Sequence, residues 1–316
     1  MITKEAILQA HDRIAAFIHQ TPVMRSTAIN ALAGADIQFK CENFQKVGAF
    51  KARGAMNAIL QIDKTRPPIL TTHSSGNHGQ AVAFAAKANG FKAFIVMPKT
   101  APEVKKKAVL GYGATVIECE PTLEAREAAT REIVEEKGAL LIHPFDNDHI
   151  IAGQATAAKE LIAYQQQHQQ KPFDYIVAPV GGGGLLSGTA LSAHYFSPQT
   201  KVIGAEPEGA ADAVLSFKTG KVEQFAPIHT LADGLLTTLS ERTLAIIRAH
   251  AEAILTVSDA EIIAAMRLIW ERMKIIVEPS SATVLAVVLK NKTLFADQKI
   301  GLLISGGNVD LGKLPF

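Results

Sequence analysis

Residues 175–200 read YIVAPVGGGGLLSGTALSAHYFSPQT, and this stretch decides between a membrane protein and an α/β fold. It contains 26 residues without Asp, Glu, Lys or Arg, which is long enough for one membrane-spanning helix. However, Pro179 and the four glycines at 181–184 would leave backbone groups without hydrogen bonds in lipid. We therefore interpret the stretch as a short buried strand, a glycine loop and a helix.

Short apolar runs of the same kind recur along the chain and predict strands that are buried on both faces. They lie at 69–72, 93–97, 115–117, 140–142, 175–180, 202–205 and 300–304. Segments with helical spacing lie between them, at 79–88, 102–110, 123–137 and 185–193. Strands that alternate with helices are typical of parallel-sheet α/β proteins. A capping box formed by Ser258 and Glu261 predicts the start of a further helix.

Length and composition exclude several classes of protein. The chain has 316 residues, enough for two domains with a sizeable core, so a small disulfide-stapled scaffold is excluded. Its formal net charge of +2 argues against a nucleic-acid partner. Cys41 and Cys119 are too few for a disulfide framework. Because the first residues lack the apolar core of a signal peptide, we expect a cytoplasmic protein with no membrane partner.

Three glycine-containing loops each follow an apolar strand, which is where open α/β sheets bind ligands. The loops lie at 74–79, 181–184 and 305–308. In the first loop, small side chains leave backbone N–H groups free at the start of a helix, where a carboxylate or a phosphate is favoured. Each loop alone is also compatible with an ordinary capped turn. The recurrence of the pattern is what points to a ligand site.

The four consecutive glycines predict a phosphate site. Such a run costs conformational entropy, so it is expected where the backbone needs positive φ or approaches a ligand closely. A nest of backbone N–H groups suits a phosphate. The run is not a P-loop, because no Gly-Lys-Ser/Thr follows it. It is not the dinucleotide fingerprint either, because Leu186 breaks the spacing of the third glycine.

Lys51 is a second candidate for chemistry, within the sequence GAFKARG at 48–54. A single lysine among glycines is commonly a solvated charge. If it is desolvated beside Phe50 and near Arg53, the pKa of its amine falls and the amine becomes a nucleophile. The local sequence leaves both interpretations open.

Together these features resemble the fold-type II pyridoxal 5'-phosphate enzymes, in the branch of serine/threonine dehydratases and serine racemases. The resemblance extends over nearly the whole chain and depends on motifs that occur in a fixed order. These are KCEN at 40–43, FKARG at 50–54, SSGNHG at 74–79, GGGG at 181–184, EP at 206–207, EPS at 278–280 and SGGN at 305–308. It implies a two-lobed α/β fold with a cleft between the lobes. The large cofactor-binding lobe would have a parallel sheet and comprise residues 1–68 and 147–316, and residues 69–146 would form an inserted smaller α/β lobe.

The resemblance gives several residues a role toward the cofactor. Lys51 matches the lysine that binds pyridoxal 5'-phosphate covalently, and Phe50 matches the residue that packs beside the cofactor ring. Asn77 matches the partner of the phenolic oxygen, and Ser305 matches the hydroxyl that faces the pyridine nitrogen. Because a neutral hydroxyl is a poor proton donor, we expect this nitrogen to remain largely unprotonated. The phosphate cradle matches Gly181, Gly182, Gly183 and Gly184.

The substrate is expected to be a small hydroxy amino acid. Its binding residues match one loop and one position on a helix: Ser74, Ser75, Gly76, Asn77, His78 and Arg126. Ser75 matches the residue that faces the substrate carbon opposite Lys51, and in serine racemases these two act as a pair of bases. Arg126 matches an arginine that reaches the distal end of the substrate in racemases and hydroxyaspartate dehydratases. An exposed arginine on a helix surface is equally compatible with the sequence around Arg126.

The racemase branch also implies a divalent-cation site and a homodimer. Glu206, Asp212 and the carbonyl of Ala210 match the cation ligands, and hard oxygen ligands suit Mg²⁺ or Ca²⁺. Two positions depart from the family pattern. Ala49 stands where serine is common, and Ser281 stands where glycine or alanine is usual.

The implied activity is that of an L-serine/L-threonine ammonia-lyase, a dehydratase that yields a 2-oxo acid and ammonia and that also accepts threo-3-hydroxyaspartate. Lys51 would remove the α-proton before the β-hydroxyl leaves. One alternative is a serine racemase in which Lys51 and Ser75 are the two bases. Another is a phosphate- or nucleotide-binding protein without covalent cofactor chemistry, against which the missing dinucleotide fingerprint argues.

Overall fold

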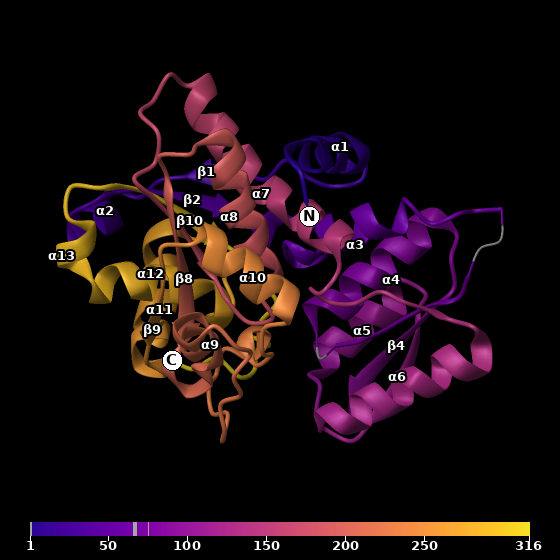
Figure 1. The fold of residues 1–316 in the computed structure, drawn as a ribbon. Helices are drawn as coiled ribbons and strands as arrows, with labels where there is room; N and C mark the ends of the chain where they lie inside the picture. The colour runs from indigo at the N-terminus through magenta and orange to yellow at the C-terminus, as the bar shows by residue number, and fades with distance from the viewer. Residues whose placement is uncertain (1, 66–67, 75) are drawn as a thin grey trace.

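Two separate β-sheets organise this computed structural model, which describes residues 2–65, 68–74 and 76–316 (Figure 1). The larger sheet contains, in spatial order, β1 (Val23–Met24), β2 (Asp36–Cys41), β10 (Lys299–Ile304), β7 (Tyr175–Pro179), β8 (Lys201–Pro207) and β9 (Ala253–Val257). The smaller sheet contains β5 (Thr115–Cys119), β4 (Ala93–Pro98), β3 (Leu70–His73) and β6 (Leu140–Leu141). Every neighbouring pair is parallel except β1 with β2. The predicted α/β class with parallel sheets is therefore confirmed.

Helices connect the strands and cover both sheets. The α-helices are α1 (Lys4–Ile14), α2 (Thr27–Ala33), α3 (Lys51–Ile59), α4 (Asn77–Asn89), α5 (Glu103–Gly111), α6 (Leu123–Lys137), α7 (Asp148–Gln167), α8 (Gly184–Phe196), α9 (Asp212–Thr219), α10 (Glu241–His250), α11 (Asp259–Met273), α12 (Pro279–Lys290) and α13 (Lys292–Phe295). The short 3₁₀ turns are η1 (Glu42–Phe44), η2 (Lys46–Gly48), η3 (Glu208–Ala210) and η4 (Asp233–Leu235). The predicted capping box is present at the start of α11, where Ser258 and Glu261 bond each other's backbone N–H groups.

The uncharged stretch 175–200 forms strand β7, the glycine loop and helix α8, as its sequence predicts. Among the described residues, no helix is both long enough and apolar enough to cross a membrane. Alternate residues of β7 pack on opposite faces of the sheet. Val177 joins the core under α11 and α12, whereas Ile176 and Ala178 join the core under α7 and α8. Burial on both faces explains why this strand is apolar throughout.

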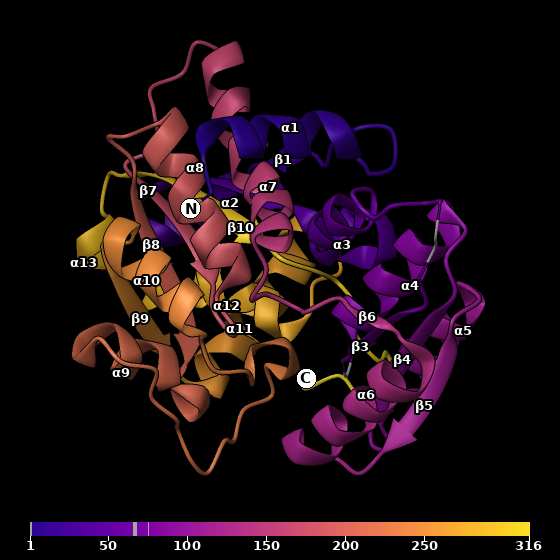
Figure 2. The same ribbon diagram turned by 45° about the vertical axis from the view of Figure 1, so that its right-hand side comes forward.

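Helix α3 lies where the parts of the fold built on the two sheets meet, and Figure 2 shows it between α7 and α4. On one side, Ala52, Ala55 and Met56 share a buried core with residues of α4. On the other side, α3 touches α7 closely: a Cβ atom added to Gly153 of α7 would lie 2.6 Å from Cα of Gly54. The first residue of α3 is therefore held at the boundary between the two sheets.

Three strands of the larger sheet, β1, β2 and β9, are absent from the sequence-based prediction. The residues of β2 are DIQFKC, so the strand contains two charges and a glutamine although most of it is buried. Its lysine, Lys40, is neutralised inside the protein by Glu160 of α7, 120 positions further along the chain. A local apolar pattern could not reveal a strand whose burial depends on such a distant partner.

Candidate active site

A cavity of about 620 Å³ opens between the two sheets and receives residues from both. It brings together every described residue that the sequence assigned to the cofactor or the substrate. These are Phe50, Lys51, Ser74, Gly76, Asn77, His78, Arg126, Gly181, Gly182, Gly183, Gly184 and Ser305. Ser75 lies outside the described residues. The assigned metal ligands Glu206, Ala210 and Asp212 do not line this cavity.

Lys51 begins helix α3 and extends its amine into the cavity. The Nζ atom donates a hydrogen bond to the carbonyl of Pro144 at 3.1 Å and lies 5.2 Å from the centre of the Phe50 ring. Burial lowers the pKa of the Lys51 amine to about 8, and the nearby carboxylate of Glu278 opposes part of this shift. A minor but useful fraction of the amine, roughly 10–20%, is therefore neutral near physiological pH, as a nucleophile or a base requires.

The glycine loop forms a cradle of unused backbone donors at the start of α8. None of the N–H groups at 181–184 bonds to a described residue. A side chain cannot be accommodated here, because a Cβ atom on Gly182 would lie 2.2 Å from the ring of Phe145. Gly183 has φ = 86°, a conformation that glycine adopts without strain. Free N–H groups at a helix N-terminus suit a phosphate group.

The loop before helix α4 offers a second set of donors. Ser74 Oγ accepts the N–H of Gly76 at 3.1 Å, and the start of α4 has no side-chain cap among the described residues. The Asn77 amide is fixed on both sides: its Nδ2 donates to Glu278 Oε1 and its Oδ1 accepts from Asn308 Nδ2, each at 2.8 Å. This arrangement holds the amide at the cavity wall, where it can meet a polar group of a ligand.

His78 lines the cavity but is bonded as a structural histidine. Its Nε2 lies 2.9 Å from the carbonyl of Ile142, which can only accept a hydrogen bond. Burial, followed by the charge of Lys51, holds the pKa of His78 well below its ordinary value. The ring is therefore neutral, with the proton on Nε2. Its Nδ1 is buried and has no hydrogen-bond partner among the described residues.

Arg126 lies on α6 and lines the cavity from the side of the smaller sheet. Its side chain is partly buried, and its Nε makes a long hydrogen bond of 3.3 Å to the carbonyl of Thr122. The guanidinium therefore retains further donors that can face the cavity.

Four charged residues of this cavity received no role from the sequence: Lys105, Glu124, Asp233 and Glu278. Lys105 of α5 is almost fully buried and forms an ion pair with Asp233 of η4. Burial and then the charge of Asp233 raise the pKa of Glu278 to about 7. Lys105 belongs to a run of three lysines and Glu278 precedes a proline, and neither context indicates burial. Glu278 was noted only as part of the EPS motif, and the pair of Lys105 with Asp233 left no local signal, because 128 positions separate these two residues.

The residues assigned to a cation lie together at the end of β8 and the start of α9. The two carboxylate oxygens of Glu206 accept the N–H groups of Ala213 and Val214 at 2.6 and 2.9 Å. Asp212 Oδ2 is buried without a hydrogen-bond partner among the described residues. Burial raises the pKa of Glu206 to about 8 and that of Asp212 to about 6. Two buried carboxylates with an orphaned oxygen suit a hard cation. No cluster of three or more His, Cys, Asp or Glu residues that could hold a metal occurs in the described part of the chain.

Comparison with known proteins gives consistent results. Residues 14–306 match the family described as pyridoxal-phosphate dependent enzymes. A serine racemase of Dictyostelium discoideum is 49% identical, with 99% of this chain and 97% of that protein aligned. A beta-hydroxyaspartate dehydratase of Paracoccus denitrificans is 46% identical, over 99% of this chain and 98% of that protein. The crystal structure of a T.th. threonine deaminase superposes with a TM-score of 0.93 at 43% identity, covering 98% of this chain and 99% of that one.

Proposed function

This chain belongs to the pyridoxal-phosphate dependent enzyme family, and on that premise we propose that it converts L-serine or L-threonine into a 2-oxo acid and ammonia. One observation carries the proposal: the amine of Lys51 faces the same cavity as the N–H groups at 181–184, which bond to none of the residues that the structure describes. The family match favours this hypothesis over that of a nucleotide-binding protein without covalent cofactor chemistry.

The residues of the cavity fit pyridoxal 5'-phosphate. The amides at 181–184 would hold its phosphate, Lys51 would bind it covalently, and Phe50 would pack beside its ring. Asn77 would meet the phenolic oxygen and Ser305 the ring nitrogen. When bound, the cofactor supplies an electron sink that stabilises negative charge at the α-carbon of the substrate.

Each protein group then has a defined task toward the substrate. The Ser74 hydroxyl and the N–H groups at the start of α4 would hold the substrate carboxylate, and Gly76, whose N–H is bonded to Ser74 Oγ, would position that hydroxyl. Lys51 Nζ removes the α-proton, which its lowered pKa permits near neutral pH. The β-hydroxyl leaves as water after gaining a proton, and hydrolysis of the released enamine yields the 2-oxo acid and ammonia. Arg126, at the cavity wall, would pair with the second carboxylate of threo-3-hydroxyaspartate.

A serine racemase is the second candidate, and the 49% identity to the Dictyostelium discoideum enzyme favours it. In this reaction Lys51 removes the α-proton from one face and Ser75 returns a proton to the other. Elimination and racemisation share the removal of the α-proton and differ only in the later steps. Ser75→Ala should therefore suppress the formation of D-serine more strongly than the elimination of L-serine. Equal losses of both activities would remove the role assigned to Ser75.

A product assay tests the main proposal. The purified protein, loaded with pyridoxal 5'-phosphate, is given L-serine, L-threonine and L-threo-3-hydroxyaspartate, and keto acid and D-enantiomer are measured together. Lys51→Ala should abolish both products and the visible absorbance of the bound cofactor. Lys46→Ala is the matched control, because Lys46 lies five residues earlier and outside the cavity lining. A wild-type protein that binds the cofactor yet forms neither product would contradict the proposal.

We also propose that Glu206, Asp212 and the carbonyl of Ala210 bind Mg²⁺ or Ca²⁺. The buried Oδ2 of Asp212, which has no hydrogen-bond partner in the described part of the chain, and the buried Glu206 support this site. The cation would neutralise the carboxylates and thereby stabilise the start of α9. Because none of these three residues lines the cavity, we propose a structural or activating role for the cation.

The remaining proposals concern organisation. We propose that residues 1–68 and 147–316 form the large lobe and residues 69–146 the small lobe, which agrees with the smaller sheet running from Leu70 to Leu141. We further propose a cytoplasmic homodimer. Two buried, unpaired cysteines, Cys41 and Cys119, are compatible with a reducing compartment. Light scattering of the purified protein tests the dimer.

A further inference from the structure

Two buried serine hydroxyls meet behind the cavity wall. Ser305 follows β10 and lines the cavity, and its Oγ lies 2.9 Å from Oγ of Ser281. Ser281 lies in the first turns of α12, is fully buried and does not line the cavity. Its Oγ also lies 2.7 Å from the carbonyl of Gly306 and accepts the N–H of Gly306 at 2.7 Å.

The direction of these hydrogen bonds follows from counting protons. A carbonyl oxygen can only accept, so the contact between Ser281 Oγ and the Gly306 carbonyl requires the hydroxyl proton of Ser281. The Gly306 N–H occupies one lone pair of Ser281 Oγ, which leaves the other free to accept. The proton between the two serine hydroxyls must therefore come from Ser305. If Ser281 donated to Ser305 instead, Ser281 Oγ and the carbonyl oxygen of Gly306 would face each other at 2.7 Å without a proton between them.

We propose that Ser281 is a positioning residue that takes the proton of Ser305 and so makes Ser305 a hydrogen-bond acceptor toward the ring nitrogen of the cofactor. This inference depends on the proposed function and on the assigned place of Ser305. It reverses the expectation from the sequence that the ring nitrogen stays largely unprotonated. An acceptor facing this nitrogen favours its protonated form, because only that form can donate a hydrogen bond.

The consequence reaches the balance between the two proposed reactions. A protonated ring nitrogen is a stronger electron sink, so the carbanion at the α-carbon lives longer. A longer life gives a proton more time to return from the opposite face, which favours racemisation over loss of the β-hydroxyl. Glycine or alanine, which the resembling family usually has at position 281, lacks the hydroxyl that binds the Ser305 proton. Ser281 thus adjusts this chain toward racemase chemistry.

The test compares wild type with Ser281→Ala and with a matched control, Thr283→Val. Thr283 is equally buried two residues further along α12, and its hydroxyl donates to the carbonyl of Ser280 at 3.0 Å, away from Ser305. Each protein is loaded with pyridoxal 5'-phosphate that carries ¹⁵N in the ring, and the ¹⁵N chemical shift reports protonation. The ratio of D-serine to pyruvate formed from L-serine is measured on the same samples.

In wild type, the ¹⁵N signal should lie in the protonated range. Ser281→Ala should lower the pKa of the ring nitrogen by about one unit, a tenfold change in the protonation equilibrium, and should lower the product ratio about threefold or more. Thr283→Val should change neither quantity. The role of Ser281 alone would be overturned by an active wild type whose ring nitrogen is unprotonated. It would also be overturned if the ¹⁵N chemical shift were the same in Ser281→Ala as in wild type. A wild type that takes up no cofactor would overturn the proposed function and this inference with it.

The Ala variant also removes the partner of the Gly306 backbone, so its folding must be checked separately. Hydrogen exchange of the Gly306 amide in the cofactor-free protein should accelerate in Ser281→Ala, whereas amides of β7 should remain protected. Ser281→Cys provides the second variant, because a thiol is a weaker donor and acceptor of similar shape. Its ¹⁵N shift should fall between those of wild type and Ser281→Ala. A shift for Ser281→Cys outside that interval would contradict the proton count.

Discussion

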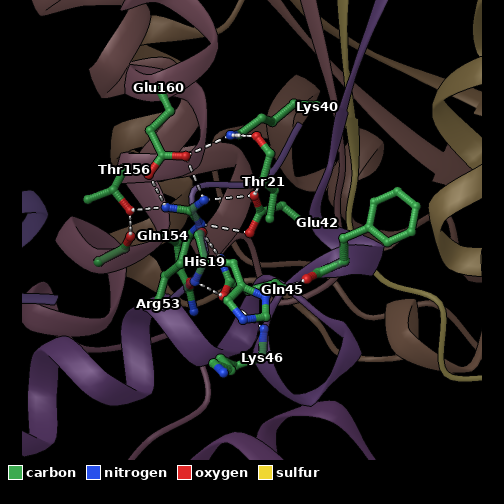
Figure 3. Close-up of polar contacts among 12 residues, drawn as sticks. His19, Thr21, Lys40, Glu42, Gln45, Lys46, Arg53, Gln154, Thr156 and Glu160 are labelled. Carbon is green, nitrogen blue, oxygen red and sulfur yellow. Dashed lines mark hydrogen bonds and ion pairs between the residues drawn. The ribbon is translucent and has the colours of Figure 1, made fainter. Parts of the chain in front are cut away.

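Arg53 holds together a buried group of charges behind the active site, and replacing it with methionine measures what this group contributes to stability. The Arg53 guanidinium is fully buried on α3 and donates to Glu42 and to Glu160 at 2.7 Å each (Figure 3). Lys40 completes the group through a bond of 2.6 Å from its Nζ to Glu160 Oε2. The two cations and the two anions balance, which makes their burial possible.

Arg53→Met would leave two buried carboxylates with one cation, Lys40. Removing one partner of a buried ion pair costs about 3–5 kcal/mol, and methionine fills much of the space that the arginine stem occupies. We expect a loss of about 4 kcal/mol, which corresponds to a fall in Tm of roughly 6 °C for a chain of this size. The assays are urea unfolding and thermal melting of the cofactor-loaded protein at pH 7.5.

The pH dependence separates charge from packing. Burial alone would raise the pKa of Glu160, but the charges and hydrogen bonds of Arg53 and then of Lys40 together outweigh burial and hold this pKa below its ordinary value. In wild type, the contribution of Glu160 is therefore present above its unfolded pKa and is lost as the pH falls through its folded pKa. In Arg53→Met burial prevails and the pKa of Glu160 rises, so protonation at low pH removes the uncompensated charge. The stability difference between the two proteins should shrink on acidification toward pH 4.5.

Two further variants make the reasoning refutable. Arg267→Met removes an exposed pair with Glu271 at 2.8 Å and should cost less than about 1 kcal/mol. The double variant Arg53→Met/Glu42→Gln restores the charge balance and leaves the pair of Lys40 with Glu160 intact, so it should be more stable than Arg53→Met. A double variant no more stable than the single one, or a loss in Arg53→Met below about 1 kcal/mol, would refute the charge argument.

Three other perturbations test the site itself. Because the pKa of Lys51 is lowered to about 8 and only its neutral amine attacks an aldehyde, cofactor uptake by the cofactor-free protein should accelerate with pH and reach half its maximal rate near pH 8. A midpoint above pH 10 in stopped-flow absorbance would contradict this. Gly182→Ala places a Cβ atom 2.2 Å from the Phe145 ring and should weaken cofactor binding about tenfold or more in a fluorescence titration, whereas Gly111→Ala, with no atom within 4 Å, should not. Millimolar magnesium or calcium chloride should raise the Tm of wild type by about 3 °C but not that of Asp212→Asn, and equal rises would argue against the cation site.

The parts of the site that the sequence predicted are those with a local physical signature. A run of glycines after an apolar strand identified the loop at 181–184, because close backbone approach and free N–H groups leave a mark on consecutive residues. The same logic located the loop before α4. Lys51 was different, since its local sequence favoured a solvated charge and only the family resemblance assigned it a role. Its burial in the cavity then explains the lowered pKa.

The parts that the sequence could not predict depend on contacts between distant residues. Lys40 and Glu160 are 120 positions apart, and Lys105 and Asp233 are 128 positions apart. Each of these charges resembles a solvated one until the fold supplies its partner, because burial of a charge is decided by the partner and not by the neighbours in sequence. The hydrogen bond of Ser281 with Ser305 has the same origin. Ser281 was noticeable in the sequence only as a departure from the family pattern.

Helix α3 carries both Lys51 and Arg53, so the buried charges around Arg53 help to position the amine of Lys51. The phosphate cradle follows β7 of the larger sheet, whereas the loop for the substrate carboxylate follows β3 of the smaller sheet. Lys51 must reach both, so the helix that carries it has to be fixed relative to both sheets. Arg53, one residue before the close contact of Gly54 with α7, ties α3 to η1 and α7 of the larger part, while apolar residues of α3 pack on α4 of the smaller part. Directional charge contacts on one side and apolar packing on the other thus fix the first turn of α3, and with it Lys51, relative to both sheets.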